Sequence, residues 1–397
     1  MVYCFSPLVR TSVLLLPLLL LLTGLMTGCA IPRVSAEARL FLDLSLEFLG
    51  EYRIPQITYE GTRVGGLSAI TYDRQRDRFY ALSDDRSTQA PARFYTLKAD
   101  LTDFTRPQPR KSPPVFSLDV ESVTLLKQEN GEAFARGTID PEGIALSPQA
   151  TVFVSSEGVA AAGVPPAIQE FDLETGTWRQ RLPIPNRYLP RQDKGETSGV
   201  QDNLGWEALT INPGSYGSRR LEPFRVFVAT ESALAQDGGG SDLTTPARWL
   251  HYLVGDGPPV LISEHLYPIE PPPPGGEING LTEILALDQG GHFLSLERSY
   301  GAAVGASARI YQVATGGATD ISGMTSLKGG GTGIQPIRKQ LLLDLKDLER
   351  RLDNLEGFTI GPRLADGSDS LLVISDDNFS RAQVNQVLLF RLRKRQG

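Results

Sequence analysis

Cysteine and histidine are scarce in this chain of 397 residues. Both cysteines, Cys4 and Cys29, precede the body of the chain, which therefore has no disulfide, no cysteine-rich zinc site and no cysteine nucleophile. The three histidines, His251, His265 and His292, are too few to supply a histidine-rich metal site. A metal site in the body would have to rely on oxygen ligands.

Positive charge is also in short supply. Lys and Arg total 39 against 46 Asp and Glu, which gives a net charge of −7 and argues against nucleic acid as a partner. A cationic ligand, or an anionic ligand reached through a metal, fits this balance better. The sequence also lacks a nucleophile elbow, a phosphate-binding loop and a His-Glu-x-x-His motif. Its 40 Gly and 28 Pro indicate many turns, too many for a helical bundle.

The N-terminal segment has the pattern of a secretory signal. Arg10 precedes an apolar run at 13–22, which is shorter than the ~20 residues of a spanning helix and contains Pro17. Cys29 follows Thr27 and Gly28, as at a bacterial lipoprotein cleavage site, so we expect a lipid on Cys29. An ordinary secretory signal with an incidental cysteine is the alternative.

These patterns predict three parts: a signal peptide at 1–28, an anchor linker at 29–45 and a single domain at 46–397. We expect an exported, membrane-anchored monomer, either periplasmic or at the cell surface.

Five segments of the domain repeat one layout: a short apolar strand, a turn, a second apolar strand and an acidic end. Their aligned first positions, 68, 142, 207, 283 and 356, lie 74, 65, 76 and 73 residues apart. Two further strand-like runs bounded by Gly and Pro follow each hairpin except the last. Four antiparallel strands repeated radially make a β-propeller blade, so we predict an all-β propeller.

The fifth repeat supplies only three strands and ends at 386–392. The run 46–52 can provide the fourth strand, which would pair the two ends of the domain and remove the sheet edges. We therefore expect five four-stranded blades, with a sixth only if it is hidden in a loop. Two β-sandwiches are the rival architecture, but they do not explain the shared acidic positions.

Acidic residues stand at equal distances from the hairpin turns. Residues so placed in an antiparallel hairpin face each other, so we expect Glu283 to face Glu297 and Glu142 to face Glu157. Radial repetition would direct all five hairpin ends toward one face of the central channel, with Ser68 as the one position without an acid. The acidic set is Asp84, Glu142, Glu157, Glu207, Glu231, Glu283, Glu297, Glu356, Asp376 and Asp377.

Clustered carboxylates raise one another's pKa and destabilise the fold unless a cation neutralises them. Oxygen ligands favour Ca²⁺ before Mg²⁺. Arg86 and Arg298 follow acidic strand ends and could pair with the acids or hold a phosphate or carboxylate. Alternatively, each acid binds backbone N–H groups and joins neighbouring blades. The predicted metal ligands are Asp84, Glu142, Glu207, Glu231, Glu283, Glu356 and Asp376.

Five blocks of the sequence, at 65–86, 140–145, 203–209, 281–298 and 354–379, resemble those of the phytase-like family described by its esterase-like activity of phytase. The similarity runs from about residue 60 to 392. It implies hydrolysis of phosphate or other esters, and β-propeller phytases are calcium-dependent. The sequence shows no obvious Lys and Arg cluster for a highly phosphorylated substrate, which favours a smaller phosphoester.

Our first hypothesis is therefore an exported, lipid-anchored, Ca²⁺-dependent hydrolase of a small anionic ester or phosphoester. Glu157, Glu297 or Asp377 would act as general base. Arg86 and Arg298 would stabilise the departing charge. The alternative is a non-catalytic propeller that binds a ligand or a protein and whose acidic ring is structural.

Overall fold

The computed structural model describes residues 40–106, 114–193, 196–212, 222–238, 245–328 and 333–394. The chain divides at Leu40/Phe41, and the unit that begins at Phe41 is the one described. The predicted signal peptide and Cys29 lie outside the described residues. Among those that are described, no helix is long and apolar enough to span a membrane.

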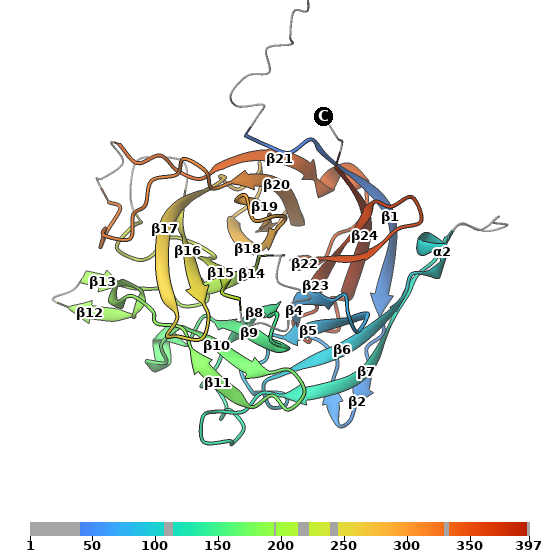
Figure 1. Ribbon diagram of the computed structural model, residues 1–397, viewed down its shortest axis with the longest axis horizontal. Helices are drawn as coiled ribbons and strands as arrows, with labels where there is room; N and C mark the ends of the chain where they lie inside the picture. Colours follow the sequence, from blue (N-terminus) through green and yellow to red (C-terminus); the bar gives the residue numbers. More distant parts are fainter. Residues whose placement is uncertain are drawn as a thin grey trace, which may run out of the picture. The chain divides into compact units, whose positions relative to one another are not determined.

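Five four-stranded antiparallel sheets surround a central channel (Figure 1). We number them as blades in chain order. Blade 1 contains β4 (Leu67–Asp73), β5 (Arg78–Ser83), β6 (Arg93–Asp100) and β7 (Ser117–Leu125). Blade 2 contains β8 (Pro141–Leu146), β9 (Thr151–Ser156), β10 (Ala167–Asp172) and β11 (Trp178–Arg181). Blade 3 contains β14 (Trp206–Ile211), β15 (Phe224–Thr230), β16 (Thr245–Val254) and β17 (Val260–Ile269). Blade 4 contains β18 (Ile278–Ala286), β19 (His292–Gly301), β20 (Gly305–Ala314) and β21 (Arg338–Asp344).

Blade 5 joins the two ends of the domain. It contains β22 (Asn354–Arg363), β23 (Asp369–Asp376), β24 (Asn385–Lys394) and β1 (Leu44–Ile54). β1 pairs with β24 from Leu44 opposite Lys394 to Ile54 opposite Asn385. The predicted propeller, its five blades and its closure by the terminal strands are confirmed, and the two-sandwich alternative is wrong.

The smaller elements lie in the connections. Two short hairpins are β2 (Thr58–Tyr59) with β3 (Thr62–Arg63) and β12 (Arg191–Asp193) with β13 (Glu196–Ser198). The helical turns are α2 (Thr102–Thr105), η1 (Ala160–Ala162), η2 (Asn186–Tyr188) and η3 (Leu345–Leu348).

The hydrophobic core lies between the blades. Strand side chains alternate between the two faces of a sheet, so each blade packs against both of its neighbours. One cluster, for example, joins Phe79 and Leu97 of blade 1 to Leu372 and Val387 of blade 5. The innermost strands β4, β8, β14, β18 and β22 also contact one another around the ring. This packing brings the N-terminal halves of all five inner strands to one end of the channel.

Each inner strand is bulged at the same place. The pairing register between the first two strands shifts at Ser68, at Glu142 and Gly143, at Glu207, at Thr282 and at Glu356. A bulge places an extra residue against the partner strand and re-aims its side chain. The bulged residues are therefore the true equivalents of one another in the five blades.

Candidate metal centre

A cavity of about 990 Å³ opens at this end of the channel. Seven of its acidic lining residues come from blades 1, 2, 3 and 5, and blade 4 contributes Arg298. All of these side chains except Asp84, which is partly exposed, are buried or nearly so. The seven acids are Asp84, Glu142, Glu157, Glu207, Glu231, Glu356 and Asp376; the exposed Glu349 and the half-buried Asp353, which precede β22, also line the cavity.

The strand register explains why blade 4 differs. In each blade, one residue of the second strand lies opposite the residue that precedes the bulge of the inner strand. These equivalent residues are Ser83, Ser156, Thr230, Glu297 and Ser375. The next residue is an acid in four blades and Arg298 in blade 4. Likewise, Thr282 is the bulged residue of blade 4, where three other blades have Glu142, Glu207 and Glu356. The repeat alignment predicted from sequence therefore placed both strands of blade 4 one residue out of register with the other blades.

The expected pair of Glu283 and Glu297 is wrong for this reason. Glu283 lies opposite Leu296, and Glu297 lies opposite Leu281. The Oε1 atom of Glu283 accepts hydrogen bonds from the backbone N of Leu209 at 3.2 Å and of Ile284 at 2.9 Å. Glu283 lines a second cavity of about 340 Å³ formed by the inner strands, not the acidic one. Glu283 therefore joins blade 4 to blade 3, which is the role that the alternative hypothesis gives to the acids.

Glu297 is bonded to groups of blades 3 and 4. Its carboxylate accepts from the Tyr267 hydroxyl at 2.8 Å, from Asn279 Nδ2 at 2.8 Å and from the backbone N of Glu270 at 3.1 Å, and it pairs with Lys339. It lies outside the described lining of the acidic cavity. The role of general base that the sequence suggested for Glu297 has no support in this placement.

Asp377 and Arg86 also lie outside that lining. Asp377 accepts from the backbone N of Gly66 at 2.8 Å and of Phe379 at 3.1 Å, so it joins blade 5 to blade 1. Arg86 Nε donates to Asp140 Oδ1 at 2.7 Å, and Arg86 Nη2 donates to Asn203 Oδ1 at 3.0 Å. Both side chains are therefore bonded to protein groups, and their predicted catalytic roles stay predictions.

Two groups of three acids have the geometry of a cation site. They are Asp84, Asp140 and Glu142, and Glu142, Glu157 and Glu207; in each group the candidate ligand oxygens lie within 4.8 Å of one another. Asp140 was not among the ligands predicted from sequence, because it precedes its inner strand instead of following a second strand. Its spacing of two residues from Glu142 was the available signal.

Glu157 points to a missing ligand. Its Oε1 accepts from the backbone N of Gly205 at 2.6 Å, whereas its buried Oε2 has no hydrogen-bond partner among the described residues. Buried polar atoms are nearly always paired, so such an atom needs a proton donor or a cation. The all-oxygen donor set fits a hard cation such as Ca²⁺.

Burial and mutual repulsion set the protonation of these acids. Burial raises the pKa of Glu142 well above its usual range, and the charges of Asp84 and Glu207 raise it further. Burial raises the pKa of Glu356 to about 7, although Arg298 and Asn354 act in the opposite direction. Without a bound cation, several of the seven carboxyl groups must therefore hold protons at neutral pH.

Arg298 is a positively charged residue that lines the cavity and lies among these acids. Its Nη2 lies 3.0 Å from Glu231 Oε1 and 3.5 Å from Glu356 Oε1. Burial alone would lower its pKa, but Glu231 and Glu356 raise the pKa overall. Because Arg298 lines the cavity, its charged group stands where an anionic ligand could meet it.

A comparison with sequence profiles agrees with the family resemblance. The sequence profile described as "Phytase-like: Esterase-like activity of phytase" matches residues 62–379, which confirms the family resemblance. A comparison with curated protein sequences finds no match.

Solved structures show weak likenesses. The catalytic domain of a Coprinopsis cinerea GH62 alpha-L-arabinofuranosidase is 10% identical, with a TM-score of 0.37 over 88% of this chain and 97% of that chain. The N-terminal domain of Nup159 is 11% identical, with a TM-score of 0.30 over 88% and 96%. The Dos1 propeller is 10% identical, with a TM-score of 0.31 over 87% and 95%. Likenesses this weak support no functional statement.

Proposed function

The chain belongs to the phytase-like family, and from this membership we propose that it is a divalent-metal-dependent hydrolase of phosphoesters or related esters. The observation that carries the proposal is the pair of carboxylate triads that share the buried Glu142. Ca²⁺ is the proposed metal, since every candidate ligand is an oxygen atom and Ca²⁺ accepts six to eight of them.

The proposed metal ligands are Asp84, Asp140, Glu142, Glu157 and Glu207. When bound, the cation would supply a Lewis acid that polarises a phosphoryl or acyl oxygen and acidifies water. It would also neutralise the acids of blades 1–3, whose negative charges otherwise repel one another.

Two residues of the chain have roles besides metal binding. Arg298, which lines the cavity, would bind the anionic ester oxygens and stabilise the charge that develops on them. Glu356, with a pKa of about 7, is suited to accept a proton from the attacking water at neutral pH. Asn354 Nδ2 donates to Glu356 Oε1 at 2.7 Å and orients this carboxyl group.

We further propose that the protein is exported and held at a membrane by a lipid on Cys29, as a monomer that does not bind nucleic acid. The support is the signal-like pattern of the first 28 residues and the net charge of −7.

The test is a thermal melt of the body from residue 41 onward, in EDTA and then with excess Ca²⁺. A ligand that binds only the folded state at 100 times its Kd stabilises it by about 2.7 kcal/mol, so we expect a rise of several degrees. Glu142→Gln removes the shared ligand and should abolish both this rise and metal-stimulated turnover on a panel of phosphoesters. Glu283→Gln is the matched control, a buried channel glutamate outside the acidic cavity, and should retain both.

The alternative function is a non-catalytic binding propeller. The pairing of Arg298 with Glu231 and Glu356 favours it, because these two acids are already satisfied within the protein. A calcium-dependent rise in Tm without turnover would favour this alternative. No rise at all would contradict the metal site.

A further inference from the structure

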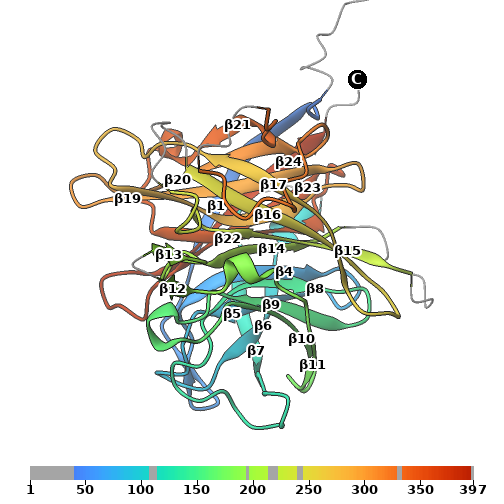
Figure 2. The ribbon, with the colours of Figure 1, turned by 90° about the vertical axis from the view of Figure 1, so that its left-hand side faces the viewer.

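The mouth of the acidic cavity has an apolar wall on blade 4. Ile278 on β18 lies directly opposite Tyr300 on β19, and Tyr300 lies opposite Ala306 on β20, so the three side chains share one face of the sheet. Val304, in the turn between β19 and β20, extends this row, and the turn projects from one face of the ring (Figure 2, left). All four residues line the cavity. Ile278, Tyr300 and Val304 are 50%, 46% and 46% exposed, which is unusual for large apolar side chains gathered in one place.

This wall continues the site from Arg298. Arg298 and Tyr300 are two residues apart on β19 and therefore project from the same face, about 7 Å apart along the strand. An anionic group bound at Arg298, which lines the cavity, would thus place any attached apolar body against Tyr300 and Ile278. Blades 1–3 contribute no large apolar side chain to the described lining of this cavity.

The edge next to this wall is mainly basic. Lys346 in η3 and Arg350 and Arg351, which precede β22, are exposed and line the same cavity, together with the exposed Glu349 and the half-buried Asp353. Arg350 stacks over the ring of Phe48 at 4.8 Å. These cations favour a substrate that carries negative charge as it enters. The cavity volume of about 990 Å³ is at the upper end of ligand pockets and far exceeds the needs of a bare phosphate.

We propose that the substrate is an anionic phosphoester with an apolar alkyl or aryl leaving group, which binds against Ile278, Tyr300 and Val304. This inference rests on the proposed function. In the reaction, the oxygen of water bonds to phosphorus, the bond between phosphorus and the ester oxygen breaks, and the leaving group departs as the alcohol or phenol after it takes up a proton. The apolar wall supplies binding energy and selects the substrate, whereas the acids and Arg298 act on the phosphoryl group.

Binding of non-hydrolysable phosphonates separates selection from turnover. Isothermal titration calorimetry on the calcium-loaded protein would compare methylphosphonate with hexylphosphonate. We expect hexylphosphonate to bind at least tenfold more tightly. The double variant Ile278→Ser and Tyr300→Ser should reduce this preference to below threefold and leave the affinity for methylphosphonate unchanged. Ile262→Ser is the matched control, because Ile262 is 47% exposed but lies on β17 outside the cavity lining, and it should retain the preference.

Turnover of hexyl phosphate and of glycerol phosphate completes the test. Preferential hydrolysis of hexyl phosphate, lost in the double variant through KM, supports the proposal. Equal affinities for the two phosphonates, or no binding of either, would overturn it even if glycerol phosphate is hydrolysed. A tenfold preference in binding without hydrolysis of any ester would support the apolar site while contradicting the proposed hydrolase.

Discussion

Arg298 carries a positive charge at a position where each of the other four blades has an acid. Four blades place an acid after the second strand, and blade 4 places Arg298 there. Arg298 pairs with Glu231 and Glu356 and partly neutralises these acids of blades 3 and 5. In the triads centred on Glu142, Arg86 pairs with Asp140, whereas Glu142 and Glu157 form no ion pair with a described cation. The acids of the cavity therefore differ in how far arginine balances their charge.

Glu356 gives a pH dependence that can be measured without metal. Its pKa is about 7 in the folded protein against an ordinary value of 4.5, so between these values the folded state binds more protons than the unfolded state. This stabilisation is complete below pH 4.5 and decreases as the pH rises through 7. In the parent protein, the free energy of unfolding should fall by about 3 kcal/mol through this group as the pH rises from 4.5 to above 7. Glu356→Gln should lack this fall.

The measurement is urea denaturation in EDTA at pH 5 and at pH 8. Glu349→Gln, an exposed carboxyl at the same cavity, should behave as the parent protein does. An unchanged difference between the two pH values in Glu356→Gln would contradict the assignment.

Among the elements, the inner strands are specialised for close approach. A Cβ added to Gly357 would lie 2.6 Å from the carbonyl oxygen of Ser68, and one added to Gly143 would lie 2.5 Å from that of Glu207. The equivalent residues Ala69 and Ala208 are also small. Blade 4 has Glu283 at this position, and its carboxylate accepts a hydrogen bond from the backbone N of Leu209 on β14. Small side chains at this level let the inner strands of adjacent blades pack closely around the channel.

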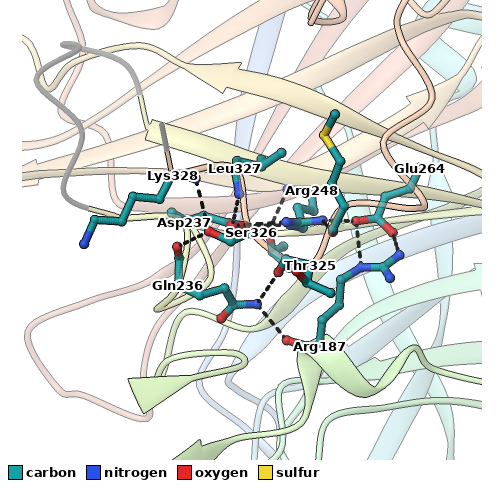
Figure 3. A network of polar contacts seen from close by, with 12 residues as sticks. Arg187, Gln236, Asp237, Arg248, Glu264, Thr325, Ser326, Leu327 and Lys328 are labelled. Atoms are coloured by element: carbon teal, nitrogen blue, oxygen red, sulfur yellow. Dashed lines mark hydrogen bonds and ion pairs between the residues drawn. The ribbon is translucent and has the colours of Figure 1, made fainter. Parts of the chain in front are cut away.

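The outer strands of blade 3 are held by a buried ion network (Figure 3). Arg248 on β16 donates from Nε to Asp237 Oδ2 at 2.6 Å and from Nη1 to Glu264 Oε1 at 2.5 Å, and Arg187 of η2 also pairs with Glu264. Asp237 accepts from the backbone N of Leu327 at 2.7 Å. The network thus joins three connecting segments to β16 and β17.

Arg248→Met should destabilise the protein by about 3–5 kcal/mol, because it leaves Asp237 buried without its cation. The calcium-dependent rise in Tm should persist, since these residues lie outside the acidic cavity. Arg225→Met, at an exposed position on β15, is the control and should change stability by no more than about 0.5 kcal/mol. Both variants can be compared by thermal melts with and without Ca²⁺. A loss of the calcium response in Arg248→Met alone would show that the network supports the site.

At the scale of the whole propeller, closure depends on β1 pairing with β24. Phe48 of β1 meets Phe390 of β24 edge to face, with ring centroids 5.5 Å apart, and Phe390 is fully buried. The contacts of the inner strands run without a break around the ring, so no blade has an independent core. The five blades should consequently unfold together.

Phe390→Ala should lower the free energy of unfolding by about 3–5 kcal/mol while unfolding remains a single transition. Phe153→Ala, a buried phenylalanine of blade 2, serves as the comparison and should shift the same transition. Guanidinium denaturation followed by fluorescence and by circular dichroism checks this. An early second transition in Phe390→Ala only would mean that blade 5 opens separately.

Much of the architecture could be read from residue order. Alternating apolar runs, turn residues and the repeated acidic ends are local properties, and they were sufficient to predict five blades, the closing role of 46–52 and the placement of Glu142, Glu157, Glu207 and Glu356 at one cavity. The closure was predictable because one repeat was short by a strand and an unassigned strand remained.

The tertiary structure decided which blade 4 residues face the cavity. A β-bulge is one residue in a ladder, and a slip of one residue moves a side chain to the other face of the sheet. Counting from the turn could not detect it, so Glu283 and Glu297 were aligned where Thr282 and Arg298 belong. The approach of Asp140 to Asp84 and the row formed by Ile278 and Tyr300 depend likewise on strands that meet only in three dimensions. The sequence alone determined the ring and most of its acids; their pairing, the position of Arg298 among them and the apolar wall beside it follow from how the strands register and pack.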